Sequence, residues 1–475
     1  MSVFWAVAAL FRKGRRRRVV ATAFALLLCC SAHAEQRKSP VELGARVKSV
    51  DRCRSQLENV YQTALDTHAY GLAGETKYLD PEMIEWGLSF DESGVVGRWV
   101  NGSLRANEAL FDTVWGGVYA HSKGGDWKQP CYTKLLARQS AMIALYAAAY
   151  RSSGIAEYRA LAEKTADYVE RFLKGPTGSY CTSQGACGSD AGVERKYYQR
   201  GDVERRKRGV PALDTRVYIG ENADFVRAVS ELYAVSNDER FKEMALGGAR
   251  MLVAAEKGDS SASVGSRVRY SRERIAVGAA FLSLYSATGD KEWLSRARAA
   301  LDGVVRKSSA GDGLGFSEDD RIEISASLAR LSNMMYHYVR HTGYRDAARR
   351  ALESAVPDRC EDIGARDAAR LLLAERELGE PPPYVALIGD PEQSSARELW
   401  GVMLSRSPSY VLREQFSSAS EAGVASDVRY PKLPKPAAFV CAEKRCSLPI
   451  FDPTELRERI AEMTTGTRDA SHAGS

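Results

Sequence analysis

The sequence predicts a mainly α-helical protein, an (α/α)6-type toroid of helix hairpins followed by a small C-terminal α/β unit. Three observations support this fold class. A helix-hairpin pattern recurs four times, further helical patterns flank the repeats, and the pattern changes after three consecutive prolines at residues 381–383. We therefore expect the toroid in residues 35–380, the α/β unit in residues 381–464 and a disordered tail in residues 465–475.

Each repeat combines an apolar-faced helix, a tight turn and a returning helix. The four repeats cover residues 135–172, 224–253, 275–305 and 324–355. A hairpin of this length cannot bury its apolar face alone, so the repeats are expected to stack against one another.

The repeats also share a spacing. An alanine lies eight residues after each expected turn residue, where a small side chain lets two helices approach closely. The turn residues are Gly154, Asn237, Gly289 and Gly343, and the alanines are Ala162, Ala245, Ala297 and Ala351. In three of the four repeats an aromatic residue lies four residues after the turn, namely Tyr158, Phe241 and Trp293.

Helical patterns at residues 41–66, 95–112 and 365–378 flank the repeats. They bring the total to about eleven helices, close to the twelve of a closed six-hairpin ring, while an open solenoid is the structural alternative. The long connections at residues 174–220 and 256–272 are expected to build a pocket on one rim.

The C-terminal part has the pattern of a small α/β unit. Strands are expected at residues 384–388, 410–412 and 438–440, with a helix at 396–404. Pro453 opens a last helix at residues 454–463, and Asp452 is well placed as its N-cap.

Residues 1–34 have the pattern of a cleaved signal peptide. A basic run at residues 12–18 precedes an apolar stretch at 19–30, and small residues lead to Ala34. The apolar stretch is shorter than the roughly 20 residues that a spanning helix needs. We therefore expect a periplasmic or secreted protein without stable membrane insertion, exported by either the Sec or the twin-arginine route.

The charge of the chain argues against nucleic acid as a partner. Residues 1–34 hold six of the 67 Lys and Arg residues and none of the 61 Asp and Glu residues. The remaining chain therefore has no net formal charge, and the electrostatic attraction that nucleic-acid binding needs is missing.

Two segments resemble the thioredoxin-domain-containing proteins typified by spermatogenesis-associated protein twenty. Residues 436–456, PAAFVCAEKRCSLPIFDPTEL, are similar to the closing motif of that family, and residues 116–136, GGVYAHSKGGDWKQPCYTKLL, are similar to its glycine-rich loop. The resemblance covers roughly residues 105–460. It implies an (α/α)6 toroid related to N-acylglucosamine epimerases and six-hairpin glycosidases.

The chain departs from the family pattern at three places. Residues 35–104 are too few and too helical for the family's thioredoxin domain. The family's Pro-His-Phe-Glu-Lys appears as Pro-Cys-Tyr-Thr-Lys, with Cys131 in place of the histidine and Lys134 retained. The family's Ser-Gln-Asp-Ala-Asp appears as Ser-Gln-Gly-Ala-Cys, ending in Cys187. Both the histidine and the acids of the family site are therefore lost.

Seven cysteines follow residue 34, and export makes disulfides the default for them, with one thiol left over. They are Cys53, Cys131, Cys181, Cys187, Cys360, Cys441 and Cys446. The resemblance places Cys131 and Cys187 on loops that face each other, which suggests a bond between them, and a Cys181–Cys187 bond is the alternative. Cys441 and Cys446 are interpreted as a structural disulfide rather than a reactive dithiol.

The glycine-rich loop offers side chains for a sugar ring. Tyr119 and Trp127 could stack on a sugar, and His121 and Asp126 could hydrogen-bond to it. A loop histidine bonded to a backbone carbonyl is the competing interpretation of His121. No spacing supports a metal site of Cys131, Cys187 and His121.

Carboxylates at the starts of inner helices are the remaining catalytic candidates, because a toroid pocket is lined by these helix ends. We expect Asp214 and Glu221 to act with His121, and Glu273, Asp320 and Glu323 occupy comparable positions. By the resemblance, Arg216 and Asn222 retain a cation and an amide of the family site and join Lys134 in binding. The competing interpretation of each acid is a helix cap.

Two functions are therefore expected. The first is carbohydrate processing or carbohydrate binding in the toroid, as an isomerase or a hydrolase if the protein is an enzyme. The second is a non-enzymatic partner of a separate exported thioredoxin-like protein, with cysteines as its clients. We expect no cofactor and no metal, since His337 and His341 lie one turn apart but lack a third ligand.

Overall fold

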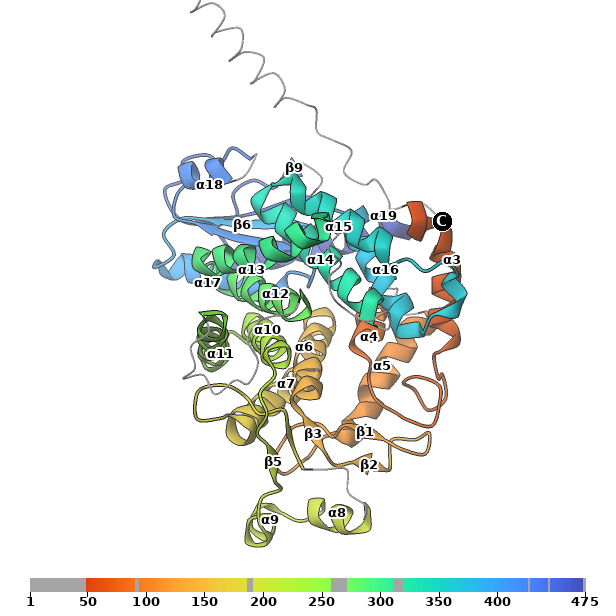
Figure 1. The fold of residues 1–475 in the computed structure, drawn as a ribbon. Helices are drawn as coiled ribbons and strands as arrows, with labels where there is room; N and C mark the ends of the chain where they lie inside the picture. The colour runs from red at the N-terminus through yellow and green to blue at the C-terminus, as the bar shows by residue number, and fades with distance from the viewer. Residues whose placement is uncertain are drawn as a thin grey trace, which may run out of the picture. The chain divides into compact units, whose positions relative to one another are not determined.

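Six helices form a closed inner ring in a computed structural model of the chain, and each contacts the next around the ring (Figure 1). They are α4 (Pro81–Gly87), α6 (Leu136–Ser153), α10 (Ile219–Ser236), α12 (Ser271–Thr288), α14 (Arg321–Val339) and α16 (Ala365–Gly379). The contact between α16 and α4 closes the ring. The predicted toroid is thereby confirmed, and the open solenoid is excluded.

Each inner helix pairs with one further helix. The partners, in the same order, are α5 (Val95–Asn107), α7 (Ala156–Tyr168), α11 (Glu239–Lys257), α13 (Lys291–Ala310), α15 (Thr342–Ala355) and α3 (Lys48–Thr63). The last pair joins the first described helix of the chain to the last helix of the ring.

The structure describes residues 48–89, 94–185, 191–257, 271–310, 320–425, 428–442 and 445–472. These residues belong to one structural unit, residues 46–475. The predicted signal peptide and Cys187 lie outside the described residues. None of the helices within the described ranges is long and apolar enough to cross a membrane.

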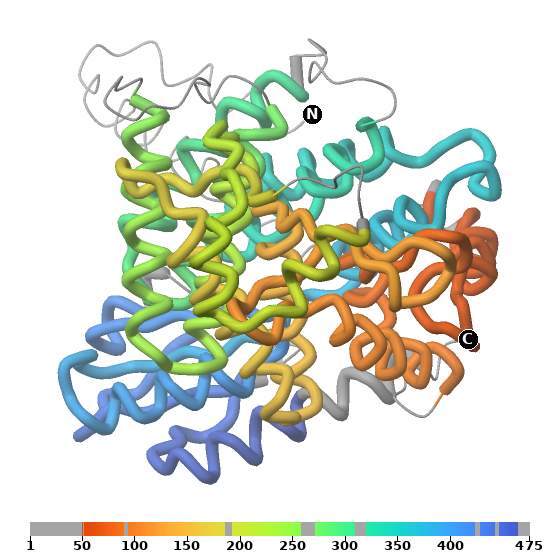
Figure 2. The backbone as a smooth tube through the Cα atoms, turned by 90° about the horizontal axis from the view of Figure 1, so that it is seen from below, coloured from red at the N-terminus to blue at the C-terminus, as the bar shows by residue number. Residues whose placement is uncertain are grey.

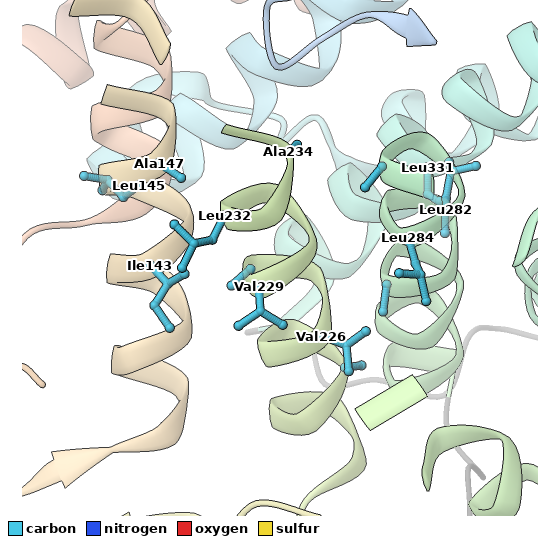
Figure 3. Packing of buried hydrophobic residues seen from close by; sticks show 14 of the residues in the cluster. Ile143, Leu145, Ala147, Val226, Val229, Leu232, Ala234, Leu282, Leu284 and Leu331 are labelled. Carbon is cyan, nitrogen blue, oxygen red and sulfur yellow. The ribbon is translucent and has the colours of Figure 1, made fainter. Parts of the chain in front are cut away.

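Aliphatic side chains fill the contacts between neighbouring inner helices. Ile143 of α6 and Val229 and Leu232 of α10 are fully buried, as is Leu284 of α12 (Figure 3). Burial of each such side chain contributes about 1.5–3 kcal/mol. The ring is therefore held by an apolar seam, and polar residues of the inner helices must lie elsewhere.

The four repeats end their inner helices in the same way. Residues Gly154, Asn237, Gly289 and Arg340 all have φ between 55° and 73°. Each donates its backbone N–H to the carbonyl oxygen of a tyrosine four residues earlier, at 2.7–2.8 Å; the tyrosines are Tyr150, Tyr233, Tyr285 and Tyr336. This left-handed residue satisfies a carbonyl that the helix end would otherwise leave unpaired.

The fourth turn was expected at Gly343 but lies at Arg340. Gly343 is inside α15 because Nδ1 of His341 accepts its N–H at 3.2 Å and starts that helix early. Counting from Arg340, the aromatic residue is Tyr344 and the alanine is Ala348, both buried. The repeat spacing therefore holds in all four hairpins.

A small sheet closes the C-terminal ends of the inner helices. Strand β6 (Tyr384–Ile388) pairs in parallel with β7 (Leu412–Phe416) and antiparallel with β8 (Ala437–Ala442), which pairs with β9 (Arg445–Cys446). Helix α17 (Ser394–Arg406) packs on α10, and Nε1 of Trp400 donates to the carbonyl of Ala287 at the end of α12. The sheet also carries α18 (Ala419–Ala425).

Two details of this unit differ from expectation. Strand β7 begins at Leu412, where the predicted strand ended. Helix α19 (Pro453–His472) continues past residue 463 into the segment for which we expected disorder. Asp452 is confirmed as its N-cap, since its Oδ1 accepts the N–H groups of Thr454 and Glu455 at 2.8 and 3.0 Å.

Disulfides connect two pairs of described cysteines. The predicted bond between Cys441 and Cys446 is confirmed. A second bond joins Cys53 of α3 to Cys360, which precedes α16, across 307 residues of sequence. Sequence reasoning did not find this pair, because no local spacing relates cysteines so far apart.

The structure excludes one of the two pairings expected for Cys187. Cys131 is disulfide-bonded to a partner outside the described residues. Cys181 is a free, buried thiol, so the alternative Cys181–Cys187 bond is wrong. The Cys131–Cys187 bond stays a prediction.

Candidate functional site

The glycine-rich loop lies at the N-terminal ends of the inner helices. Strands β1 (His121–Ser122) and β2 (Pro130–Cys131) pair in this loop, and β3 (Lys134–Leu135) leads into α6. Strand β3 pairs with β4 (Ser183–Gln184), which pairs with β5 (Leu213–Asp214) just before α10. The sheet therefore gathers the loops that precede two inner helices.

Two aromatic residues expected to stack on a sugar are buried instead. Trp127 packs on Gly71 and donates its Nε1–H to the carbonyl of Ala69 at 2.7 Å. Tyr119 packs edge-on against Tyr132, with ring centroids 4.8 Å apart. Both rings are used inside the fold, so we assign them structural roles.

Lys134 is also structural. Its ammonium is fully buried, and it donates to Oδ2 of Asp112 at 2.8 Å and to the carbonyl of Gly116 at 2.6 Å. The same carboxylate oxygen accepts from Nη1 of Arg205 at 2.6 Å, and Arg205 is fully buried as well. The three side chains form a buried triad with one negative and two positive charges.

The pKa values of the triad have opposed causes. Burial would raise the pKa of Asp112, but Lys134 and the hydrogen bonds from both cations hold it below its usual value. Burial lowers the pKa of Lys134 to about 8, against the attraction of Asp112. Asp112 is therefore the group on which the burial of both cations depends.

We expect Asp112→Asn to lower the free energy of unfolding by about 3 kcal/mol, because it leaves two buried cations without a counter-charge. Trypsin should then cleave faster near Arg205, because that residue would have lost its ion pair with Asp112. Asp167→Asn is the control, since Asp167 is exposed and its ion pair in the described ranges is with exposed Arg240, and it should change stability by less than about 1 kcal/mol. Equal urea midpoints for the two variants would contradict a structural role of the triad.

The polar groups of the Asn222 side chain also bond to backbone groups of the protein. Its Oδ1 accepts the N–H of Tyr180 at 2.8 Å, and its Nδ2 donates to the carbonyls of Tyr180 and Tyr218 at 3.0 Å. The side chain has no exposed surface. It fixes the loop before β4 to the start of α10 and has no free group for a ligand.

Asp214 lies in β5 just before α10 and Glu221 in the first turn of that helix, and the two acids act on each other electrostatically. Oδ1 of Asp214 accepts from Nε of Arg216 at 2.9 Å, and both side chains are partly exposed. Oε2 of Glu221 accepts from Oγ1 of Thr182 at 2.6 Å. Burial raises the pKa of Glu221, and the charge of Asp214 contributes to this shift.

The remaining predicted residues lie in other surroundings. Asp126 is partly exposed and accepts the N–H of Lys128 at 3.0 Å, which closes a local turn. His121 is half-buried, and burial lowers its pKa, with Lys123 and Arg138 adding to the shift. His337 is buried, while His341 caps α15. Within the described ranges no group of His, Cys, Asp and Glu side chains is placed to hold a metal.

The N-terminal ends of the inner helices carry a ring of charges that the sequence reasoning missed. All six inner helices carry charged residues near their starts, several of them more than one. One residue of each helix is considered together here, because most of these six are linked to one another across the ring. The six residues are Glu82 of α4, Arg138 of α6, Asp224 of α10, Arg272 of α12, Glu323 of α14 and Arg370 of α16. We call these residues the charged ring.

Ion pairs link neighbouring members of the charged ring. Nη2 of Arg370 lies 3.2 Å from Glu82 and 2.8 Å from Glu323, and Arg272 pairs with Glu323. Arg272 also acts electrostatically on Asp224. These contacts join five of the six inner helices at the mouth of the ring.

Asp224 differs from the other two acids of the charged ring. Within the described part of the chain it accepts no hydrogen bond, and its nearest cation is Nη2 of Arg227 at 3.9 Å. Its side chain is 49% exposed. Burial by the surrounding helices raises its pKa; Arg227 and Arg272 oppose the shift, and Glu323 and Glu82 add to it. Asp224 is therefore an accessible acid whose proton is held more tightly than usual.

A second layer of charges lies deeper among the inner helices. Arg330 of α14 bonds to Glu377 of α16 at 2.7 and 2.9 Å and also pairs with Glu85 of α4. The Glu85 side chain is 41% exposed although it pairs with Arg330 of another inner helix. Solvent therefore reaches the space inside the ring, which we call the lumen.

A pocket of about 450 Å³ opens at the mouth of the lumen. Its lining includes Tyr78 before α4, Glu323 of α14 and Arg366, Asp367 and Arg370 of α16. The pocket therefore shares two residues with the charged ring. Acids and cations in one open pocket can bind a polar ligand and exchange protons with it.

The thiol-redox function has less support among the described residues. Cys181 is the one free thiol in that part of the chain, and burial raises its pKa. A thiol must ionise to exchange with a disulfide. The described cysteines are thus either bonded or poorly reactive.

Comparison with known proteins identifies the fold but no family. No family model matches the chain, and no curated protein sequence matches it. The structure is similar to a cellobiose 2-epimerase from Spirochaeta thermophila, with a TM-score of 0.51 and 15% identity over 70% of this chain and 97% of that one. The toroid fold is therefore shared with a carbohydrate epimerase.

Two further solved structures match less closely. A sugar epimerase from a ruminal bacterium has a TM-score of 0.49 and 12% identity over 69% of this chain and 99% of that one. A family 76 α-mannanase from Bacteroides thetaiotaomicron has a TM-score of 0.48 and 12% identity over 69% of this chain and 94% of that one.

Proposed function

We propose that the protein binds a glycan at the mouth of the lumen and cleaves it by acid-base catalysis. Asp224 is the proton donor in this proposal. Glu82 or Glu323, each hydrogen-bonded to Arg370, accepts a proton from the water that attacks the anomeric carbon as Asp224 protonates the leaving oxygen. Hydrolysis of a glycoside needs such a pair, one acid protonated and one charged.

The state of Asp224 is the observation that carries the proposal. A carboxylic acid with a raised pKa and no hydrogen-bond donor of its own can give its proton to a leaving oxygen. The fold shared with a cellobiose 2-epimerase makes a sugar the first ligand to test. The resemblance of residues 116–136 and 436–456 to the thioredoxin-domain-containing family belongs to this proposal and agrees with a toroid of this class.

Export to the periplasm or the medium is part of the same proposal. The two disulfides between described cysteines are typical of an oxidising compartment. An exported protein would meet extracellular or cell-wall glycans.

A panel of neutral and acidic oligosaccharides, incubated with the purified protein and followed by NMR, tests the function. We expect new reducing ends from at least one glycan. If epimers form without new reducing ends, the reaction is isomerisation and not hydrolysis. If the NMR signals shift on adding a glycan but no product forms, the protein binds the glycan without converting it. No product and no binding across the panel would refute the proposal.

A further inference from the structure

Residues 191–218 form a basic segment beside the mouth of the lumen, which we call the basic arm. It contains α8 (Ala191–Tyr198), α9 (Asp202–Arg208) and β5. Between residues 191 and 209 there are seven Lys and Arg residues and three Asp and Glu residues. Because the chain after residue 34 has no net charge, this excess of positive charge is a local feature.

Most cations of the basic arm face solvent. The exposed ones in its two helices are Arg195, Lys196, Arg206, Lys207 and Arg208. Arg206 and Lys207 have carboxylate partners, Asp202 and Glu204, both on the same short helix. Exposed pairs of this kind are weak and leave the cations able to bind an external anion.

The basic arm is nevertheless firmly attached. Buried Arg205 joins it to Asp112, and Nε1 of Trp115 donates to Oδ1 of Asp202 at 2.7 Å. The ring of Tyr198 stacks on Tyr132 with centroids 4.8 Å apart. An exposed cationic surface that is already fixed loses little conformational entropy when it binds a ligand.

The end of the basic arm leads directly to the charged ring. After β5, the guanidinium of Arg216 lies 5.9 Å from the ring centroid of Tyr218, which is 42% exposed. Tyr218 is the N-cap residue of α10, the helix that carries Asp224. An exposed tyrosine can stack on the face of a sugar, so cations and a stacking ring lie on the path to the proposed acid.

Strand pairing places the basic arm beside the N-terminal ends of α6 and α10, because β5 pairs with β4 and β4 with β3, which leads into α6. In Figure 1, α8 and α9 lie beyond β5, on the side of the described unit opposite to β6. Figure 2 is seen from the side on which α8 and α9 lie. The C-terminal unit packs at the C-terminal ends of the inner helices, which leaves the N-terminal ends beside the basic arm for a polymer to approach.

From these observations we infer that the glycan is polyanionic, a carboxylated polysaccharide whose chain lies along the basic arm while its end enters the lumen. This inference rests on the proposed function. Carboxylates spaced along the chain would meet Lys196, Lys207 and Arg208 in turn, and a sugar ring would stack on Tyr218. A neutral glycan would gain nothing from these cations.

The test compares two variants that each lose four exposed cations. The arm variant is Arg195→Gln, Lys196→Gln, Lys207→Gln and Arg208→Gln, which leaves buried Arg205 intact. The control variant changes two adjacent pairs on the helices α13 and α15: Arg306→Gln, Lys307→Gln, Arg349→Gln and Arg350→Gln. Binding of an oligogalacturonate and of a neutral manno-oligosaccharide of equal length is measured by calorimetry at low and high salt.

We expect the wild type to bind the oligogalacturonate more tightly than the neutral oligosaccharide. The arm variant should weaken that binding about 10- to 100-fold and reduce its salt dependence, while the control variant should not. Single-stranded DNA and phosphatidylglycerol vesicles are parallel probes. Tighter binding of either probe than of oligogalacturonate, or equal oligogalacturonate binding by both variants, would overturn the inference.

Repeating the titration with Asp224→Asn separates this inference from the proposed function. Binding tests the basic arm, whereas turnover tests Asp224. Cleavage of a neutral glycan without oligogalacturonate binding would refute only the polyanionic substrate. Oligogalacturonate binding that depends on the basic arm, without cleavage of any glycan, would refute only the catalytic function.

Discussion

Asp224→Asn should lower the turnover of the cleaved glycan by about 10²- to 10⁴-fold, the usual contribution of a general acid. The amide occupies the same space as the carboxylic acid but cannot give a proton to the leaving oxygen. Asp224 accepts no hydrogen bond within the described residues, so the substitution should leave the fold and the binding of the glycan intact. Initial rates and a binding titration with the same glycan measure the two effects separately.

The pH dependence of turnover gives a second test of Asp224. Burial raises the pKa of this acid above its usual value, so the proton needed for catalysis is present below the raised pKa and is lost as the pH rises through it. The wild-type rate should therefore fall on the alkaline side. The residual rate of Asp224→Asn should lack that decline, because the asparagine does not titrate.

Asp346→Asn is a closely matched control. Asp346 of α15 lies 3.9 Å from Nη2 of Arg349, three residues later, and is 42% exposed. Asp224 has the same distance to an arginine at the same spacing and a similar exposure. Asp346 is outside the inner ring, however, so its substitution should leave turnover unchanged. A similar loss in both variants would attribute the effect to charge or stability rather than to proton donation.

The repeats allowed the fold to be predicted from the sequence, because the turn of each hairpin lies at a fixed spacing from an aromatic residue and an alanine. The left-handed residues Gly154, Asn237 and Gly289 were recognisable as types that tolerate positive φ. Arg340 was not, since arginine rarely adopts this conformation, and Gly343 three residues later offered a more familiar signal. The error in the fourth repeat therefore came from residue preference, while the spacing of aromatic and alanine residues was correct.

The candidate site was harder to predict for a different reason. Lys134 and Asn222 have polar groups typical of binding sites, but in the structure those groups pair inside the fold. The charged ring gathers residues from six helices spread between Glu82 and Arg370, and only the closure of the ring brings them together. Asp224 was assigned to the start of a helix that in fact begins at Ile219, which hid its place in the charged ring.

The disulfide between Cys53 and Cys360 should contribute strongly to stability, because it holds together the two chain segments that close the ring. Helix α3 pairs with α16, and Arg54 beside Cys53 forms an ion pair with Glu375 of α16. A bond across 307 residues removes much conformational entropy from the unfolded chain. From the loop-closure entropy alone, we expect the double variant Cys53→Ser, Cys360→Ser to lose about 5 kcal/mol of unfolding free energy.

The second disulfide provides the matched control, since Cys441 and Cys446 are separated by only five positions. The double variant Cys441→Ser, Cys446→Ser has the same chemical change but should lose only about 2 kcal/mol, because the loop that its bond closes is short. Urea unfolding of both variants under oxidising conditions measures the difference. Equal losses would mean that contacts between α3 and α16, rather than the length of the closed loop, determine how firmly the ring is shut.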